Sequence, residues 1–283
     1  MPYAKRRTVG TRGRSGGFKR KPYTARRNAK MPVKFRKAIT TVVNRQIHAK
    51  LENKYAALTI APTQIPAVIG DFQINNVLNI MPSIQRGTLP SQRIGMKISP
   101  RYMEIRGWLT LDMNDTLQDY DRVCVRLILG RPKKYPLYPQ AASEVTGSPY
   151  TNWSSELINY GAGAARFAGT LEALQSPVNS GVFTTMAERR MTITRPRFYD
   201  APLVGSDSFR YSGNSTRFFR IRVKCPKTFI YRTPEGNDPF PNNFNPVLLA
   251  GYSLLNGSTP AEPDVSPRPV TISYTTRLTY EDA

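Results

Sequence analysis

Basic side chains are concentrated at one end of the chain, in a pattern suited to binding phosphate groups. Residues 1–50 contain sixteen lysines and arginines and no carboxylate, and the first acidic residue is Glu52. Guanidinium groups bind phosphate oxygens in bidentate fashion, whereas lysines act as point charges. Fourteen of these cations fall within positions 1–37, and we predict that they bind nucleic acid: Lys5, Arg6, Arg7, Arg12, Arg14, Lys19, Arg20, Lys21, Arg26, Arg27, Lys30, Lys34, Arg36 and Lys37.

Aromatic residues are interleaved with these cations, and aromatic rings stack on unpaired bases without selecting their sequence. The four are Tyr3, Phe18, Tyr23 and Phe35. We therefore expect binding to single strands that is largely indifferent to base sequence and that weakens steeply with salt. A basic tail that only improves solubility is the alternative.

The same basic clusters also match nuclear-import signals. They are Lys5-Arg6-Arg7, Lys19-Arg20-Lys21 and Arg26-Arg27. Host nuclear-import receptors are therefore possible partners, and the sequence does not separate import from phosphate binding.

A second group of cations alternates with apolar residues in a predicted strand. Arg220, Arg222 and Lys224 occupy one parity of the segment that ends at Cys225. Successive side chains of a strand point to opposite faces, so one face is expected to be uniformly cationic. These three residues complete our set of candidate nucleic-acid contacts. An ordinary solvated face, or pairing with acidic groups of a neighbour, is equally compatible with the pattern.

Other chemistry has little support in the sequence. His48 is the only histidine, which removes Ser-His-Asp and Cys-His arrangements and multi-histidine metal sites unless His48 itself takes part. The two cysteines, Cys124 and Cys225, lie in apolar runs and are expected to be free thiols. A hydrolase that uses Glu104 with Asp112 has no recognisable pocket motif. We expect no enzyme activity, no cofactor and no metal site.

Four carboxylates cluster in one predicted turn. They are Asp112, Asp115, Asp119 and Asp121. Such a cluster binds calcium in some proteins, but a solvated turn is the simpler interpretation.

The elements that position these residues are predicted from periodicity. Residues 1–32 have too few apolar side chains to offset the entropy of ordering and are expected to form a disordered arm. Residues 33–54 have apolar residues at spacings of three and four, which predicts a short basic amphipathic helix. Residues 55–283 contain eight strand-like segments, at 55–61, 74–81, 102–113, 122–130, 182–195, 216–225, 246–255 and 269–280.

Eight such segments indicate an all-β domain, a single eight-stranded antiparallel jelly roll. In the segment 102–113 one parity is mostly apolar and the other polar, as in a half-solvated strand, with Trp108 as an exception on the polar side. The stretch 131–180 is predicted to be a long functional loop. No run of about 18 apolar residues is present, and the first 30 residues lack the apolar stretch of a secretory signal. We therefore expect no membrane span and no conventional secretion.

Four short segments resemble stretches of a known family. Residues 85–98 read QRGTLPSQRIGMKI, residues 51–55 read LENKY, residues 190–196 read RMTITRP and residues 277–282 read RLTYED. In this order they resemble the capsid proteins of circular single-stranded DNA viruses that encode a rolling-circle replication protein, of circovirus or geminivirus type. The sequence departs from that family after 121–129, where it continues as Gly130-Arg-Pro-Lys-Lys-Tyr135.

The resemblance implies a jelly roll that assembles as about sixty copies in a closed icosahedral T=1 shell. It also implies a single-stranded DNA genome as partner, and localisation in the virion and, during assembly, in the host cell nucleus. Two other classes stay open. The capsid of a small RNA virus has the same charge pattern, and a cellular RNA-binding or ribosomal protein also combines a basic terminus with a β domain.

Overall fold

The computed structural model describes residues 32–50, 53–69, 77–111, 122–134, 153–161, 163–194, 197–199, 210–212, 215–232, 239–257 and 269–282. The chain forms two units, Met1–Lys50 and Leu51–Ala283. Apart from Pro32, the arm predicted for 1–32 lies outside the described residues, and so does the aspartate-rich turn.

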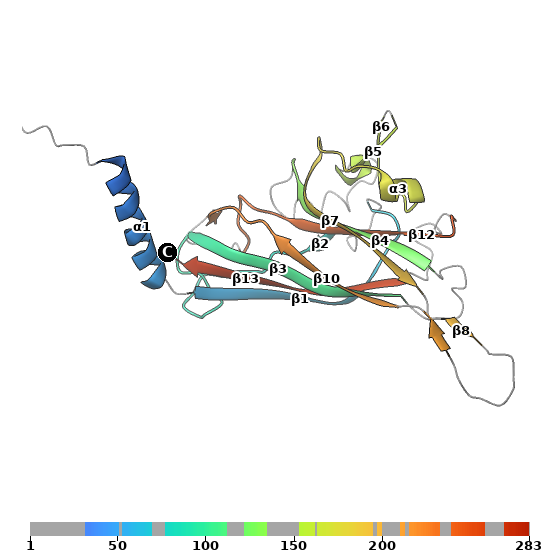
Figure 1. The fold of residues 1–283 in the computed structure, drawn as a ribbon, viewed down its shortest axis with the longest axis horizontal. Helices are drawn as coiled ribbons and strands as arrows, with labels where there is room; N and C mark the ends of the chain where they lie inside the picture. The colour runs from blue at the N-terminus through green and yellow to red at the C-terminus, as the bar shows by residue number, and fades with distance from the viewer. Residues whose placement is uncertain are drawn as a thin grey trace, which may run out of the picture. The chain divides into compact units, whose positions relative to one another are not determined.

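The larger unit is all-β and consists of two antiparallel sheets that face each other in two layers (Figure 1). The first sheet has the order β1-β13-β3-β10. Its strands are β1 (Asn53–Ile65), β13 (Val270–Asp282), β3 (Lys97–Leu111) and β10 (Thr216–Val223), with the short β11 (Phe229–Ile230) paired to the start of β3. The second sheet has the order β2-β12-β4-β7. Its strands are β2 (Val77–Asn79), β12 (Val247–Leu254), β4 (Arg122–Pro132) and β7 (Phe183–Thr194).

The connectivity of these main strands is that of a jelly roll. When they are counted along the chain, the first sheet has the order 1-8-3-6 and the second 2-7-4-5. Strands that follow one another therefore tend to lie in opposite sheets, and the chain winds around a shared core. That core is apolar, with fully buried residues from both sheets such as Ile105, Leu109, Leu127 and Leu248. The predicted all-β, jelly-roll fold is confirmed.

All eight predicted strand segments overlap one of these strands, and the differences lie at the ends. β3 begins at Lys97, five residues before the predicted start. Proline has no N–H to donate to a neighbouring strand, so Pro100 disfavours a strand at this position. In the structure Pro100 pairs with Tyr280 at a register shift between β3 and β13. Irregular positions of this kind tolerate proline inside a sheet.

The first sheet is buried on one face and open on the other. In β3, Ile105 and Leu109 are buried, whereas Arg106 and Trp108 are exposed, so the predicted half-solvated strand is confirmed. Gly107 lies on the core-facing parity at a point of close approach. A Cβ atom there would lie 2.3 Å from the Ser273 carbonyl oxygen and 2.8 Å from the Phe219 ring, and only glycine fits this position.

The central strands β12 and β4 of the second sheet are buried on both faces, whereas β7 at its edge keeps exposed residues such as Arg189 and Arg190. Every residue of β12 is buried, because residues 153–182 cover the side that faces away from the first sheet. These residues form η3 (Trp153–Glu156), β5 (Ile158–Tyr160), β6 (Gly163–Ala165) and α3 (Leu171–Gln175). Trp153, Phe167 and Leu174 of this segment pack with residues of the second sheet, such as Ile128 and Leu249, in a second buried cluster. This part of the predicted loop 131–180 is therefore a packed cover, and that prediction is wrong for it.

The covering segment is also held by polar contacts. Arg126, fully buried on β4, donates to the Ala173 carbonyl in α3 and pairs with Glu188 on β7. The Ser253 hydroxyl donates to the Thr170 carbonyl at 2.8 Å. Desolvation by burial lowers the pKa of Arg126, and the contact with Glu188 opposes this shift. The cover therefore depends on a buried cation as well as on apolar packing.

In the smaller unit, residues 33–50 form the helix α1 (Val33–Lys50). The predicted helix extended to residue 54, but β1 begins at Asn53. From there onward, exposed side chains alternate with more buried ones, as in a strand. The apolar side chains in the first part of α1 are exposed, among them Val33, Phe35, Ile39 and Val42.

Both cysteines are free thiols, as predicted. Burial raises the pKa of the Cys225 thiol to about 12, and burial also raises the pKa of Cys124. A thiol with a pKa near 12 is ionised in about one molecule in 10⁴ at pH 8, against about a quarter of free cysteine molecules.

We expect alkylation of Cys225 by iodoacetamide at pH 8 to be on the order of a thousandfold slower in the native protein than in urea. Because the pKa is raised, the native rate should increase with pH across the range 8 to 11. Mass spectrometry of the labelled peptides measures both rates, and native labelling at the unfolded rate would contradict the raised pKa of this half-buried thiol.

Candidate nucleic-acid interface

Eleven of the predicted arm cations lie outside the described residues. They are Lys5, Arg6, Arg7, Arg12, Arg14, Lys19, Arg20, Lys21, Arg26, Arg27 and Lys30. The remaining three, Lys34, Arg36 and Lys37, lie on the first turns of α1 and are exposed. No acidic residue is present in the first turn of this helix, so nothing there offsets their charge.

Four arginines of the larger unit lie on the open face of the first sheet. Strand register places residues of β10, β3 and β13 side by side in rows across this face. One row contains Arg220, Arg106 and Thr275, and the next contains Arg222, Glu104 and Arg277. Four arginines thus surround a single carboxylate, which gives this group a net charge of +3.

Glu104 is buried beneath two of these arginines, although it lies on the solvent-facing parity of β3. Its side chain is 3% exposed. Arg106 donates to Glu104 Oε2 from Nε at 3.1 Å and from Nη2 at 2.9 Å, and Arg220 forms an ion pair with Oε1. The side chains of Arg106 and Arg220 remain 66% and 53% exposed. Glu104 therefore fixes the direction of both guanidinium groups without removing them from solvent.

Tyr102 extends this cluster along β3. Arg220 Nη2 donates to its hydroxyl at 3.1 Å, and the Arg222 guanidinium lies 5.7 Å from its ring centroid. The hydrogen bond from Arg220 is the main cause of the lowered pKa of Tyr102; desolvation opposes it, and the positive charges of both arginines add to it. The tyrosine thus responds to the same positive potential that an anion bound on this face would feel.

Two hollows adjoin each other on this face. The first, the Tyr102 hollow, has a volume of about 400 Å³ and is lined by Tyr102, Glu104, Arg106, Thr275, Arg277 and Thr279. The second, the Trp108 hollow, has a volume of about 520 Å³ and is lined mainly by Trp108, Phe218, Arg106, Arg220 and Thr275. Arg106 and Thr275 line both. The face thus offers guanidinium donors and aromatic surface in two adjoining hollows.

The structure brings together Arg220 and Arg222 from the predicted set, with Lys224 exposed just beyond the end of β10. Pairing with an acidic neighbour was one alternative for these residues, and Arg220 does pair with Glu104 of the adjacent strand. Tyr102, Arg106 and Arg277 were not among the predicted contacts, because strand register decides which residues lie opposite one another. The signal that was present is Trp108, an aromatic residue on the polar parity of its strand.

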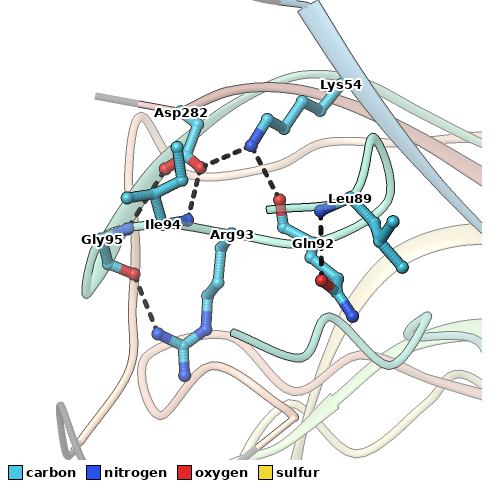
Figure 2. A network of polar contacts seen from close by, with 7 residues as sticks. All are labelled: Lys54, Leu89, Gln92, Arg93, Ile94, Gly95 and Asp282. Atoms are coloured by element: carbon cyan, nitrogen blue, oxygen red, sulfur yellow. Dashed lines mark hydrogen bonds and ion pairs between the residues drawn. The ribbon is translucent and has the colours of Figure 1, made fainter. Parts of the chain in front are cut away.

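A second polar network connects the start of β1 and the end of β13 to the loop before β3 (Figure 2). Lys54 Nζ donates to Asp282 Oδ2 at 3.1 Å and to the Gln92 carbonyl at 3.0 Å. Asp282 also accepts the backbone N–H groups of Ile94 and Gly95. The side chains of Lys54 and Asp282 are only 2% and 4% exposed. We refer to these five residues as the Lys54–Asp282 network.

This network joins three of the four segments on which the family resemblance depends. Lys54 belongs to LENKY, Gln92 to Gly95 belong to QRGTLPSQRIGMKI, and Asp282 ends RLTYED. Nearby, the Arg93 guanidinium lies 4.0 Å from the Tyr231 ring centroid and donates to the Gly95 carbonyl. The segments are therefore linked by structural contacts, and the network itself is a stabilising element of the fold.

Within the described part of the chain, no group of three or more His, Cys, Asp or Glu side chains is placed to hold a metal ion. Among the same residues, no helix has the length and apolar character needed to cross a membrane.

Comparison of the chain with known protein families gave no match, and a search of curated proteins gave no significant match. The function is therefore inferred from the charge distribution and from the geometry of the open sheet face.

Proposed function

We propose that the chain is a viral capsid protein that assembles into a small icosahedral shell and packages single-stranded DNA through its cationic arm. The proposal depends chiefly on one observation, the separation of charge from fold. Sixteen cations and no anion precede Glu52, whereas residues 51–283 carry 25 basic and 19 acidic groups around a jelly roll. Jelly rolls with this architecture are common in viral capsids, and the four resembling segments point to the circular single-stranded DNA viruses.

The arm is suited to its role because phosphate neutralisation needs no fixed register. Packaged single strands repel themselves unless cations replace the lost counterions. With about sixty copies, the fourteen cations of positions 1–37 supply roughly 840 positive charges, comparable to the phosphates of a genome of about a thousand bases. Arginines bind these phosphates in bidentate fashion and so hold the strand without selecting its sequence.

The open face of the first sheet is the second part of the proposed interface. The described residues leave this face open, and the arginines around Glu104 give it net positive charge. A strand held by the arm would meet fixed donors there. We therefore propose that this face, with Arg220, Arg222 and Lys224, faces the packaged strand.

Assembly requires surfaces that bind other copies. The loop before β3 exposes Leu89, Ile94 and Met96, with exposed fractions between 43% and 59%. The Lys54–Asp282 network fixes the backbone of this loop. Apolar side chains on a rigid loop lose little entropy on contact, and we propose that they contact neighbouring subunits. The arm clusters would also bind nuclear-import receptors before assembly.

Electron microscopy of the expressed full-length protein tests the proposal. We expect closed particles of uniform diameter that protect nucleic acid from nuclease. Extraction and digestion with DNase or RNase then identifies the packaged strand, and RNA from particles made in the presence of a replicating DNA template would favour the RNA-virus alternative. Protein that binds nucleic acid strongly but stays monomeric would contradict the capsid assignment and favour a cellular RNA-binding protein.

A further inference from the structure

Two aromatic side chains are exposed where the fold does not need them. Phe218 on β10 lies directly opposite Trp108 on β3, and both point to the open face, with exposed fractions of 80% and 41%. Directly opposite positions in an antiparallel pair have Cβ atoms about 5 Å apart. The two rings therefore present adjacent apolar surface to solvent, and such surface usually marks a binding site.

The neighbouring row supplies charge next to this apolar surface. Arg106 and Arg220 lie two residues along β3 and β10 from Trp108 and Phe218, a step of about 6.7 Å on the same face. Glu104 orients both guanidinium groups, and both stay more than half exposed. The Trp108 hollow thus combines aromatic walls with two fixed cations and the Thr275 hydroxyl group at one side.

A nucleotide has the matching chemistry, with an apolar base attached to a phosphate through one sugar. We propose that the Trp108 hollow binds an unpaired base of single-stranded nucleic acid, stacked on Trp108 or Phe218, while Arg106 and Arg220 bind an adjacent phosphate. The inference rests on the proposed function. It gives the nucleic acid a defined site on the sheet, whereas charge alone predicts only non-specific binding. Bases in a duplex have their faces covered by stacking, so the site selects single strands.

Charge argues against another copy of the same face as the occupant. Two such faces would bring eight arginines together against two buried carboxylates, and like charges disfavour the contact. Single-stranded nucleic acid supplies apolar surface and negative charge together. Because every base has a π face, the site should accept different bases with similar affinity.

Tryptophan fluorescence tests the inference on full-length protein that has been stripped of nucleic acid at high salt. The chain has two tryptophans. Trp153 is buried and stacked on Phe183, so a change in emission on binding reports Trp108. The probes are an oligothymidine of about twenty nucleotides and an abasic strand of the same length and charge. Anisotropy of a label on each probe measures binding independently.

We expect oligothymidine to quench Trp108 and the abasic strand to leave its emission unchanged, although the arm binds both. Replacing both rings, as Trp108→Thr with Phe218→Thr, should weaken oligothymidine binding about five- to 150-fold and leave abasic binding unchanged. Ile230→Thr, at an exposed apolar position of β11, is the matched control and should change neither. If the double variant does not fold, the quenching of the unmodified chain decides alone.

Different results would contradict the base-binding site and the proposed function. Binding of both probes by anisotropy without quenching, or equal loss for both probes in the double variant, would overturn the base-binding site and leave the proposed function in place. Absence of binding by anisotropy would overturn the function itself. A change of emission with protein concentration in the absence of a probe would assign the hollow to self-association and overturn the inference.

Discussion

A full-length chain with serine at the fourteen basic positions of 1–37 is expected to fold and assemble but to package almost no nucleic acid. The reason is that the body contributes little net charge, since 25 basic residues oppose 19 acidic ones after position 50. Each phosphate contact with a single strand contributes about 0.7 to the slope of log affinity against log salt, so the slope should fall by up to about ten.

The absorbance ratio of purified particles at 260 and 280 nm measures packaging, and circular dichroism checks the fold. A chain whose arm keeps its composition in scrambled order is the matched control, and it should package normally because charge needs no register. Normal packaging by the neutral-arm chain would show that the shell binds the genome without the arm. A failure of the scrambled arm would indicate sequence-specific recognition.

The second large effect is a loss of stability, expected when the buried ion pair of the Lys54–Asp282 network is broken. Lys54→Met leaves the Asp282 carboxylate buried with only two backbone N–H groups, and Asp282→Asn leaves the Lys54 ammonium facing a neutral amide. Breaking a buried pair from one side leaves an uncompensated charge, which costs about 3–5 kcal/mol of unfolding free energy. The double variant removes both charges. Its loss of unfolding free energy should be clearly smaller than the sum of the losses in the two single variants.

Urea denaturation of unassembled protein measures the unfolding free energies of the unmodified chain, the two single variants and the double variant, which together form a double-mutant cycle. Lys97→Met removes an exposed lysine from the same part of β3 and should change the unfolding free energy by less than about 0.5 kcal/mol. Additive costs in the cycle would mean that the two side chains do not interact. Because the network holds the loop with Leu89, Ile94 and Met96, either single variant should also impair assembly.

The strands could be predicted because alternation and turn residues are local properties of the sequence. Leu109 and Leu111 against Arg106 and Thr110 suffice to identify β3 and its buried face. The cover formed by 153–182 could not be predicted in the same way. Its buried residues, such as Trp153 and Phe167, are separated by glycine, alanine and serine without a period, and only the second sheet beneath them explains their burial.

The candidate site was predictable in part for a similar reason. Alternation identified the cationic face of β10, but Arg106, Glu104 and Arg277 join it only through the registers of β3 with β10 and β13. Lys54 and Asp282 are 228 positions apart, and no local pattern pairs them. Local alternation thus predicts which side chains face solvent, and the strand register decides which of them lie together.

The place of β13 has a consequence for synthesis of the protein on the ribosome. This strand lies between β1 and β3 in the first sheet, so β1 has no partner until the residues from Val270 onward have been translated. Pairing of segments so far apart in the chain is slow. Throughout elongation the nascent chain therefore displays its cations beside ribosomal and messenger RNA without a folded domain behind them. We expect RNA to be the first polyanion that a newly made chain meets, and the proposed packaging of DNA would require its later exchange.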